Sequence, residues 1–181
     1  AADLEEQLDE AGFERAVLAG ASMGAHTAAR FALERPERVA GLVLVTPAFM
    51  PGPPDEAALA QWDARAKGLR EGGVEGFMRA YGDPGVSDAM RDTVLKVMRQ
   101  RLSLHEHPDA VADALQAVPR SSPFGSLDDL GGIACPAVVV ADRDEVDPGH
   151  PLAVGTAWSD AIGCRLVVEE PGQSPIAWQG G

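Results

Sequence analysis

The feature that most constrains the fold of this sequence is a turn of small residues between an apolar run and a helix-forming run. The turn is Gly20-Ala21-Ser22-Met23-Gly24, which fits the pattern G-x-S-x-G. In this pattern the serine occupies a strained turn that joins a strand to a helix, and the glycines lie where neighbouring backbone approaches without a Cβ atom. We therefore expect Ser22 at the carboxyl end of a buried strand. The alternative is an ordinary turn in which Ser22 caps the helix.

Apolar runs and helical periodicity predict the elements around this turn. One strand begins at Ala16, and the other predicted strands are residues 39–45, 137–141 and 165–169. Helices are predicted over residues 3–10, from the turn to Leu33, and over residues 152–162. A strand, a helix and a second strand in succession imply a right-handed crossover between parallel strands. The sequence therefore predicts an α/β fold with a parallel sheet.

The middle of the chain differs in character from the rest. A run rich in Pro and Gly precedes a series of predicted helices over residues 55–71, 74–81, 87–105 and 108–118. Their methionine and aromatic side chains repeat at helical spacing, which favours a small hydrophobic core over a cofactor site. We expect three parts: a core part with the turn (1–50), an inserted helical lid (51–126) and a second core part (127–181).

The acidic composition excludes several classes of partner. The formal net charge is −13, from 15 Lys and Arg against 28 Asp and Glu, which opposes binding to nucleic acid or to an anionic membrane. No apolar run reaches the ~20 residues of a membrane span, and no signal pattern opens the sequence, so we expect a cytoplasmic protein. The two cysteines, Cys135 and Cys164, are expected as free core thiols. No cofactor or metal site is predicted, and an oligomer is compatible with the sequence.

Four features together carry a resemblance to a known family: the G-x-S-x-G turn before a helix, the segment Pro36-Glu37-Arg38-Val39 before an apolar strand, the helical insertion, and Asp144 after a late strand. In these features the sequence resembles the α/β-hydrolase fold superfamily over nearly its whole length. The resemblance implies the second half of such a fold, with a lid and without the early strands. It also implies that the loop after the third strand, which gives half of the oxyanion hole, has no counterpart here.

The resemblance assigns roles to three residues. Ser22 matches the nucleophile, the backbone N–H of Met23 matches an oxyanion-hole donor, and Asp144 matches the acid that orients the catalytic base. Asp142 and Asp147 are alternatives for the acid, and the whole acidic turn is alternatively a set of solvated carboxylates or a helix cap.

The expected base is where the sequence departs from the family. The superfamily carries a histidine after the last strand, and Gln173 occupies the matching place. A carboxamide has no basic nitrogen, so Gln173 can hydrogen-bond Ser22 but cannot take its proton. Of the other histidines, we expect His26 to be packed beside the turn, with a role as base as the alternative. We expect His150 to lie in a surface loop, and the alternative is that it approaches the carboxyl ends of the strands and replaces the missing base. His105 and His107 are expected at the carboxyl end of a helix.

Three functions follow from these observations. The first is a hydrolase that acts on a small carboxylic ester or a similar small molecule through a serine nucleophile. The second is a non-hydrolytic member of the fold that binds a small molecule, because Gln173 replaces the base. The third is a remnant of the fold without a ligand. The turn favours the first function, and Gln173 favours the second.

Overall fold

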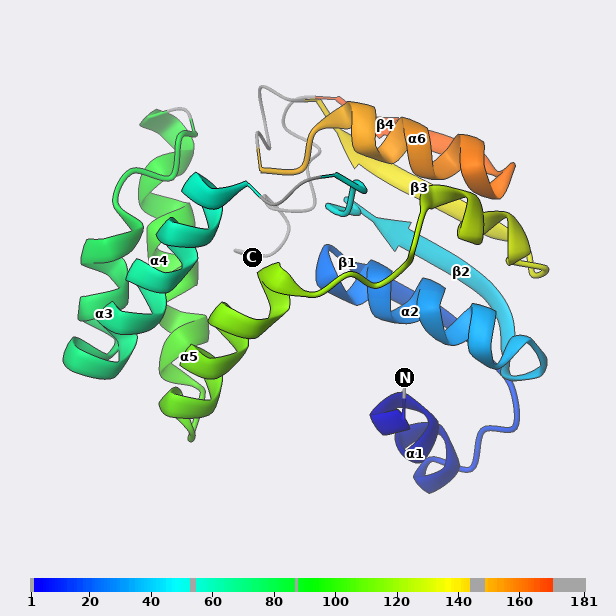
Figure 1. The fold of residues 1–181 in the computed structure, drawn as a ribbon, viewed down its shortest axis with the longest axis horizontal. Helices are drawn as coiled ribbons and strands as arrows, with labels where there is room; N and C mark the ends of the chain where they lie inside the picture. The colour runs from blue at the N-terminus through cyan, green and yellow to red at the C-terminus, as the bar shows by residue number, and fades with distance from the viewer. Residues whose placement is uncertain (1, 53–54, 87, 144–148, 171–181) are drawn as a thin grey trace. The chain divides into compact units, whose positions relative to one another are not determined.

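The computed structural model describes residues 2–52, 55–86, 88–143 and 149–170, and these form two compact units (Figure 1). The sheet unit contains the described residues up to Pro51 and those from Ser122 onward. The helical unit contains the described residues of Gly52–Ser121. Each unit has its own hydrophobic core.

The sheet unit is built on four parallel strands in the order β1-β2-β3-β4. The strands are β1 (Ala16–Ala21), β2 (Val39–Val45), β3 (Ala137–Asp142) and β4 (Arg165–Glu169). This arrangement confirms the predicted α/β fold with a parallel sheet. Because all strands run the same way, the segments that leave them at their carboxyl ends meet at one edge of the sheet. Ser22 directly follows β1 at that edge.

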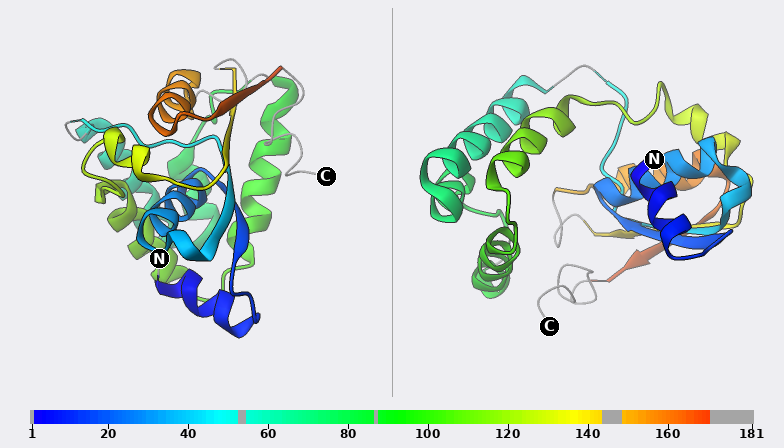
Figure 2. Two further views of the ribbon diagram at one scale, coloured as in Figure 1. Left: turned by 90° about the vertical axis from the view of Figure 1, so that its right-hand side faces the viewer. Right: turned by 90° about the horizontal axis from the view of Figure 1, so that it is seen from below.

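Two helices cover one face of this sheet. Figure 2 shows α2 (Met23–Glu34) and α6 (Leu152–Ile162) on the same face, and the short 3₁₀ segment η3 (Leu127–Gly132) contacts both. Their inward side chains meet those of the strands in one core, whose largest fully buried members include Phe31, Leu44, Leu130 and Trp158. A further helix, α1 (Ala2–Glu10), and a 3₁₀ turn, η1 (Pro36–Arg38), complete the unit at its amino-terminal side. Burial of this apolar surface is the main stabilising contribution to the unit.

The helical unit consists of α3 (Glu56–Tyr81), α4 (Asp88–Ser103), α5 (Pro108–Ala117) and the 3₁₀ turn η2 (Val118–Arg120). The α3 segment is sharply bent, because Gly72 and Gly73 have non-helical dihedral angles. The bend brings Gly68 and Gly76 together so closely that a Cβ atom on either would overlap the other's carbonyl. The sequence predicted this bend as a break between two helices, and the glycines on both sides of it explain the close return of the chain.

Candidate active site

Ser22 occupies the strained turn that the sequence predicts. Its backbone angles are φ 51° and ψ −116°, in a region that non-glycine residues rarely adopt. Its N–H donates to the carbonyl oxygen of Val45 on the neighbouring strand at 2.9 Å, which fixes the turn against β2. Its side chain makes no capping hydrogen bond to α2, so the alternative reading of Ser22 as a helix cap is wrong.

The two glycines of the motif differ in what the fold requires of them. A Cβ atom on Gly20 would overlap the carbonyl group of Gly24, so the close approach of strand and helix depends on glycine at this position. A Cβ atom on Gly24 would meet nothing within 4 Å among the described residues. The expectation that both glycines permit a close approach is therefore correct for Gly20 and wrong for Gly24.

His150 lies against Ser22, which corrects its expected place in a surface loop. The Nε2 atom of His150 is 2.8 Å from the Oγ atom of Ser22, within hydrogen-bond distance. His150 lies between β3 and α6, and that segment leaves the sheet at the same edge as the turn of Ser22. The rule that carboxyl ends of parallel strands share one edge was the available signal for this residue. An imidazole in this position can take the hydroxyl proton of a serine.

The expected acid and the residue at the expected base position fall outside the described part of the chain. The structure does not describe Asp144, Gln173 or the alternative acid Asp147, so the roles of these residues stay predictions. The other alternative, Asp142, is the last residue of β3, and its side chain is 1 % exposed. It pairs in register with Glu169 on β4. Asp142 is therefore part of the interior of the sheet edge and not a solvated turn carboxylate.

His26 is packed beside the turn, as expected. Its Nε2 atom accepts hydrogen bonds from the backbone N–H groups of Ala48 and Phe49, both at 3.1 Å. Its ring lies against that of Trp158, with centroids 5.5 Å apart. Burial, together with the smaller effect of the nearby charge of His150, lowers the pKa of His26 to about 4. His26 is therefore neutral near pH 7 and acts as a hydrogen-bond acceptor.

Met23, the predicted oxyanion-hole residue, opens α2 directly after Ser22. The first N–H groups of a helix have no acceptor within that helix, and the helix dipole makes this end attractive to negative charge. The backbone N–H of Met23 is one of these groups, while its side chain is 54 % exposed. Its position suits a donor to an oxygen that becomes negative next to Ser22.

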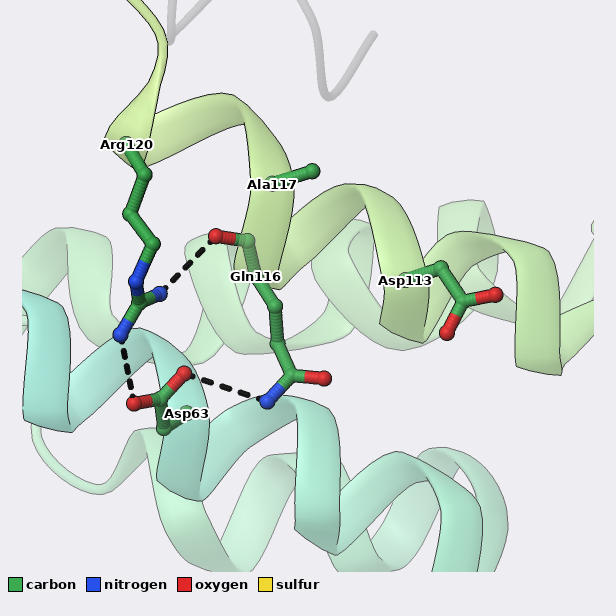
Figure 3. Close-up of a pocket in the computed structure, with 5 residues that line it drawn as sticks. All are labelled: Asp63, Asp113, Gln116, Ala117 and Arg120. Atoms are coloured by element: carbon green, nitrogen blue, oxygen red, sulfur yellow. Dashed lines mark hydrogen bonds and ion pairs between the residues drawn. The ribbon is translucent and has the colours of Figure 1, made fainter.

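A separate polar hollow lies entirely in the helical unit. Figure 3 shows its lining: Asp63, Asp113, Gln116, Ala117 and Arg120. Its volume is about 450 Å³. Asp63 accepts hydrogen bonds from Arg120 at 2.7 Å and from Gln116 at 3.2 Å, and these bonds lower its pKa. Asp63 of α3 therefore binds side chains of α5 and η2, and these polar contacts between helices account for the hollow.

The described residues offer little sign of a metal site, a membrane span or a reactive thiol. Among them, no three His, Cys, Asp or Glu side chains are grouped so that they could hold a metal ion. None of the helices described is long and apolar enough to cross a membrane. Cys135 and Cys164 are free thiols, and burial raises the pKa of each, which leaves them largely protonated and poorly nucleophilic.

Comparisons with known proteins agree with this fold. A family model described as alpha/beta hydrolase fold matches residues 1–83. A 2-hydroxy-6-oxononadienedioate/2-hydroxy-6-oxononatrienedioate hydrolase of Pseudomonas putida is 34 % identical over 165 residues, which cover 82 % of this chain and 54 % of that protein. The chain thus spans about half the length of this curated relative.

Solved structures give the same result. A thermophilic esterase from Thermogutta terrifontis is 26 % identical with a TM-score of 0.73, covering 93 % of this chain and 61 % of that one. An enol-lactonase from Burkholderia xenovorans is 25 % identical with a TM-score of 0.72, covering 97 % of this chain and 64 % of that one. The chain thus spans less than two thirds of the length of either structure. The chain therefore belongs to the α/β-hydrolase fold superfamily.

Proposed function

We propose that this protein is a hydrolase that cleaves a small carbonyl compound, with Ser22 as nucleophile and His150 as general base. The observation that carries this proposal is the 2.8 Å distance between His150 Nε2 and Ser22 Oγ. A serine hydroxyl is a weak nucleophile unless a base takes its proton, and a base at hydrogen-bond distance is the signature of an activated serine. The strained turn supports the same assignment, because it presents the hydroxyl at the sheet edge.

In the proposed reaction, Ser22 Oγ attacks the substrate carbonyl carbon while His150 Nε2 accepts the hydroxyl proton. The carbonyl oxygen becomes negatively charged, and the backbone N–H of Met23 donates a hydrogen bond to it. The protonated His150 then donates its proton to the leaving group. A water molecule, activated by His150 in the same way, hydrolyses the resulting acyl-serine and restores the hydroxyl.

Two further residues complete the proposed site. Asp144 is proposed as the acid that orients His150, because a carboxylate that holds the imidazole favours its charged form. Gln173 is proposed as a hydrogen-bonding residue without a proton-transfer role. With Gln173 unable to act as a base, the site needs a histidine from elsewhere, and His150 supplies it.

The proposed substrate class follows from the relatives. The curated relative is named for a 6-oxo dienedioate, and the solved neighbours include an esterase and an enol-lactonase. Attack on a carbonyl carbon is a step that all three substrate types permit. We therefore propose a small carboxylic ester or a lactone as substrate, and 2-hydroxy-6-oxononadienedioate as the second candidate. The Pseudomonas relative, at 34 % identity, favours this second candidate.

Hydrolysis of p-nitrophenyl butyrate and of 2-hydroxy-6-oxononadienedioate by the purified protein tests this proposal. Ser22→Ala and His150→Gln should each lower kcat by about 10²–10⁴-fold or more, since general-base catalysis contributes this much. His105→Gln, an exposed histidine in the helical unit, is the matched control and should leave kcat unchanged. Full activity in His150→Gln would contradict the assignment of the base. Saturable ligand binding without any turnover would instead support the non-hydrolytic alternative.

A further inference from the structure

The segment that follows β2 is held in an unusual conformation next to Ser22. This segment, residues 46–49, is called the post-β2 loop here. Thr46 has φ 42°, in the left-handed region, although it is not a glycine. Thr46 is buried, and its N–H donates to the carbonyl oxygen of Val140 at 2.7 Å. Backbone strain of this kind persists only where the surroundings enforce it, so the loop must be held by specific contacts.

His26 supplies two of these contacts. The N–H groups of Ala48 and Phe49 both point at its Nε2 atom, at 3.1 Å each. A neutral imidazole has one nitrogen that accepts and one that donates, so Nδ1 carries the proton and the Nε2 lone pair is shared by the two loop donors. This arrangement leaves His26 no free lone pair with which to take a proton from Ser22.

Trp158 holds the same loop from a second helix. Its Nε1–H donates to the carbonyl oxygen of Phe49 at 2.8 Å. The Trp158 side chain is fully buried, and its ring lies against those of His26 and Phe124, each with centroids 5.5 Å away. The N–H and the carbonyl of one residue, Phe49, are therefore fixed by side chains of α2 and α6 respectively.

These two helices are the ones that carry the proposed catalytic pair. His26 lies one helical turn after Ser22 on α2, and α6 begins two residues after His150. The contacts of His26 and Trp158 with the post-β2 loop therefore join the helix that follows the nucleophile to the helix that follows the base. Loss of these contacts would alter the distance between Ser22 Oγ and His150 Nε2.

We propose that His26 is a positioning residue. As a neutral acceptor it binds two N–H groups of the post-β2 loop, a contact called the His26 grip, and thereby holds Ser22 and His150 at hydrogen-bond distance. This inference rests on the proposed function only for its effect on catalysis. The grip itself is a property of the fold and can be measured without a substrate.

The hydrogen bonds from the post-β2 loop to His26 form only when His26 is neutral. Protonation of Nε2 would remove the acceptor of both loop N–H groups, and the fold therefore favours the neutral form. Because the pKa of His26 in the fold is about 4, below its ordinary value of 6.5, the stability that it contributes is present above pH 6.5 and is lost as the pH falls through 4. The titratable group that acts on His26 is His150, while the neighbouring rings of Phe49 and Trp158 carry no charge.

Two substitutions of His26 separate its acceptor role from its packing. His26→Gln places a carboxamide oxygen, which has two lone pairs, close to the position of Nε2. His26→Phe keeps a ring against Trp158 but removes the acceptor. We expect His26→Gln to retain kcat within about 3-fold, and His26→Phe to lose about 10- to 100-fold in kcat with a smaller change in KM, because a displacement of about 1 Å in a reacting pair has effects of this size. Equal loss in both variants would overturn the inference, because it would show that the acceptor atom at this position does not carry the effect.

Nuclear magnetic resonance gives a readout that does not depend on activity. In the wild type, the ¹⁵N spectrum should show His26 unprotonated at Nε2 down to about pH 4, in line with its lowered pKa. The amide protons of Ala48 and Phe49 should be protected from exchange in the wild type and in His26→Gln, and exposed in His26→Phe. Fast exchange of both amides in the wild type would overturn the grip. Protected amides in a protein without hydrolase activity would leave the grip intact and refute the proposed function alone.

Discussion

The sheet unit and the helical unit are held together in different ways. The sheet unit buries large side chains completely, including Phe31 and Trp158, and keeps two non-glycine residues, Ser22 and Thr46, in strained conformations. The helical unit has a smaller cluster around Leu69, and α4 contributes no fully buried residue to it. Exposed polar pairs complete its contacts, such as Arg70 with Asp113 and Arg120 with Asp63.

The difference indicates which unit can hold a catalytic geometry. Reacting groups must be positioned to within a fraction of an ångström, and densely packed surroundings provide this precision. Strained turns such as that of Ser22 need the same surroundings, because a loose neighbourhood would let them relax. The helical unit, with few buried side chains, is the part where substitutions are tolerated best. That this region forms a lid stays a prediction from the sequence.

The same large-to-small substitution in each unit gives the largest expected contrast. Phe31→Ala should lower the free energy of unfolding by about 3–5 kcal/mol, because Phe31 is completely buried and its rigid neighbours cannot fill the cavity. Phe77→Ala should have a smaller effect, because half-buried side chains surround the cluster of the helical unit and can move inward. Urea unfolding of both variants measures the two values. Equal losses would show that the helical unit is packed as rigidly as the sheet unit.

Adding one methyl group at each glycine of the turn gives an intermediate effect. Gly20→Ala should destabilise the fold by about 1–3 kcal/mol, because its Cβ atom would overlap the Gly24 carbonyl. Gly24→Ala should be neutral or should stabilise by up to about 1 kcal/mol, because the position is open and alanine favours a helix. The melting temperatures of the two variants decide the question. A loss in Gly24→Ala as large as that in Gly20→Ala would contradict the described geometry of the turn.

Breaking an exposed bridge should have the smallest effect. Arg120→Ala removes the ion pair with Asp63 and the hydrogen bond to the Gln116 carbonyl, and all three side chains are accessible to solvent. We expect the melting temperature to fall by no more than about 2 °C, with a smaller shift in high salt, because exposed pairs contribute little and are screened. A large shift that persists in 1 M salt (about a 3 Å screening length) would show that these bridges define the helical unit.

Much of the fold could be predicted from the sequence because its signals are local. The apolar runs define the strands, Gly20 and Ser22 define the strained turn, and Gly72 with Gly73 marks the bend in α3. The place of His150 could not be predicted in the same way, because it depends on the course of a segment without periodicity between β3 and α6. The acceptor role of His26 was also missed, because its partners are backbone N–H groups that leave no mark in the sequence.

The most direct test of the account is the rate at which a fluorophosphonate labels Ser22 in the purified protein. The wild type should be labelled at Ser22, identified by peptide mass spectrometry. His150→Gln should be labelled at least about 10²-fold more slowly, because a carboxamide at this position cannot accept the hydroxyl proton. Gln173→Ala should be labelled at close to the wild-type rate. A wild-type rate in His150→Gln, or its loss in Gln173→Ala, would contradict the claim that His150 activates Ser22.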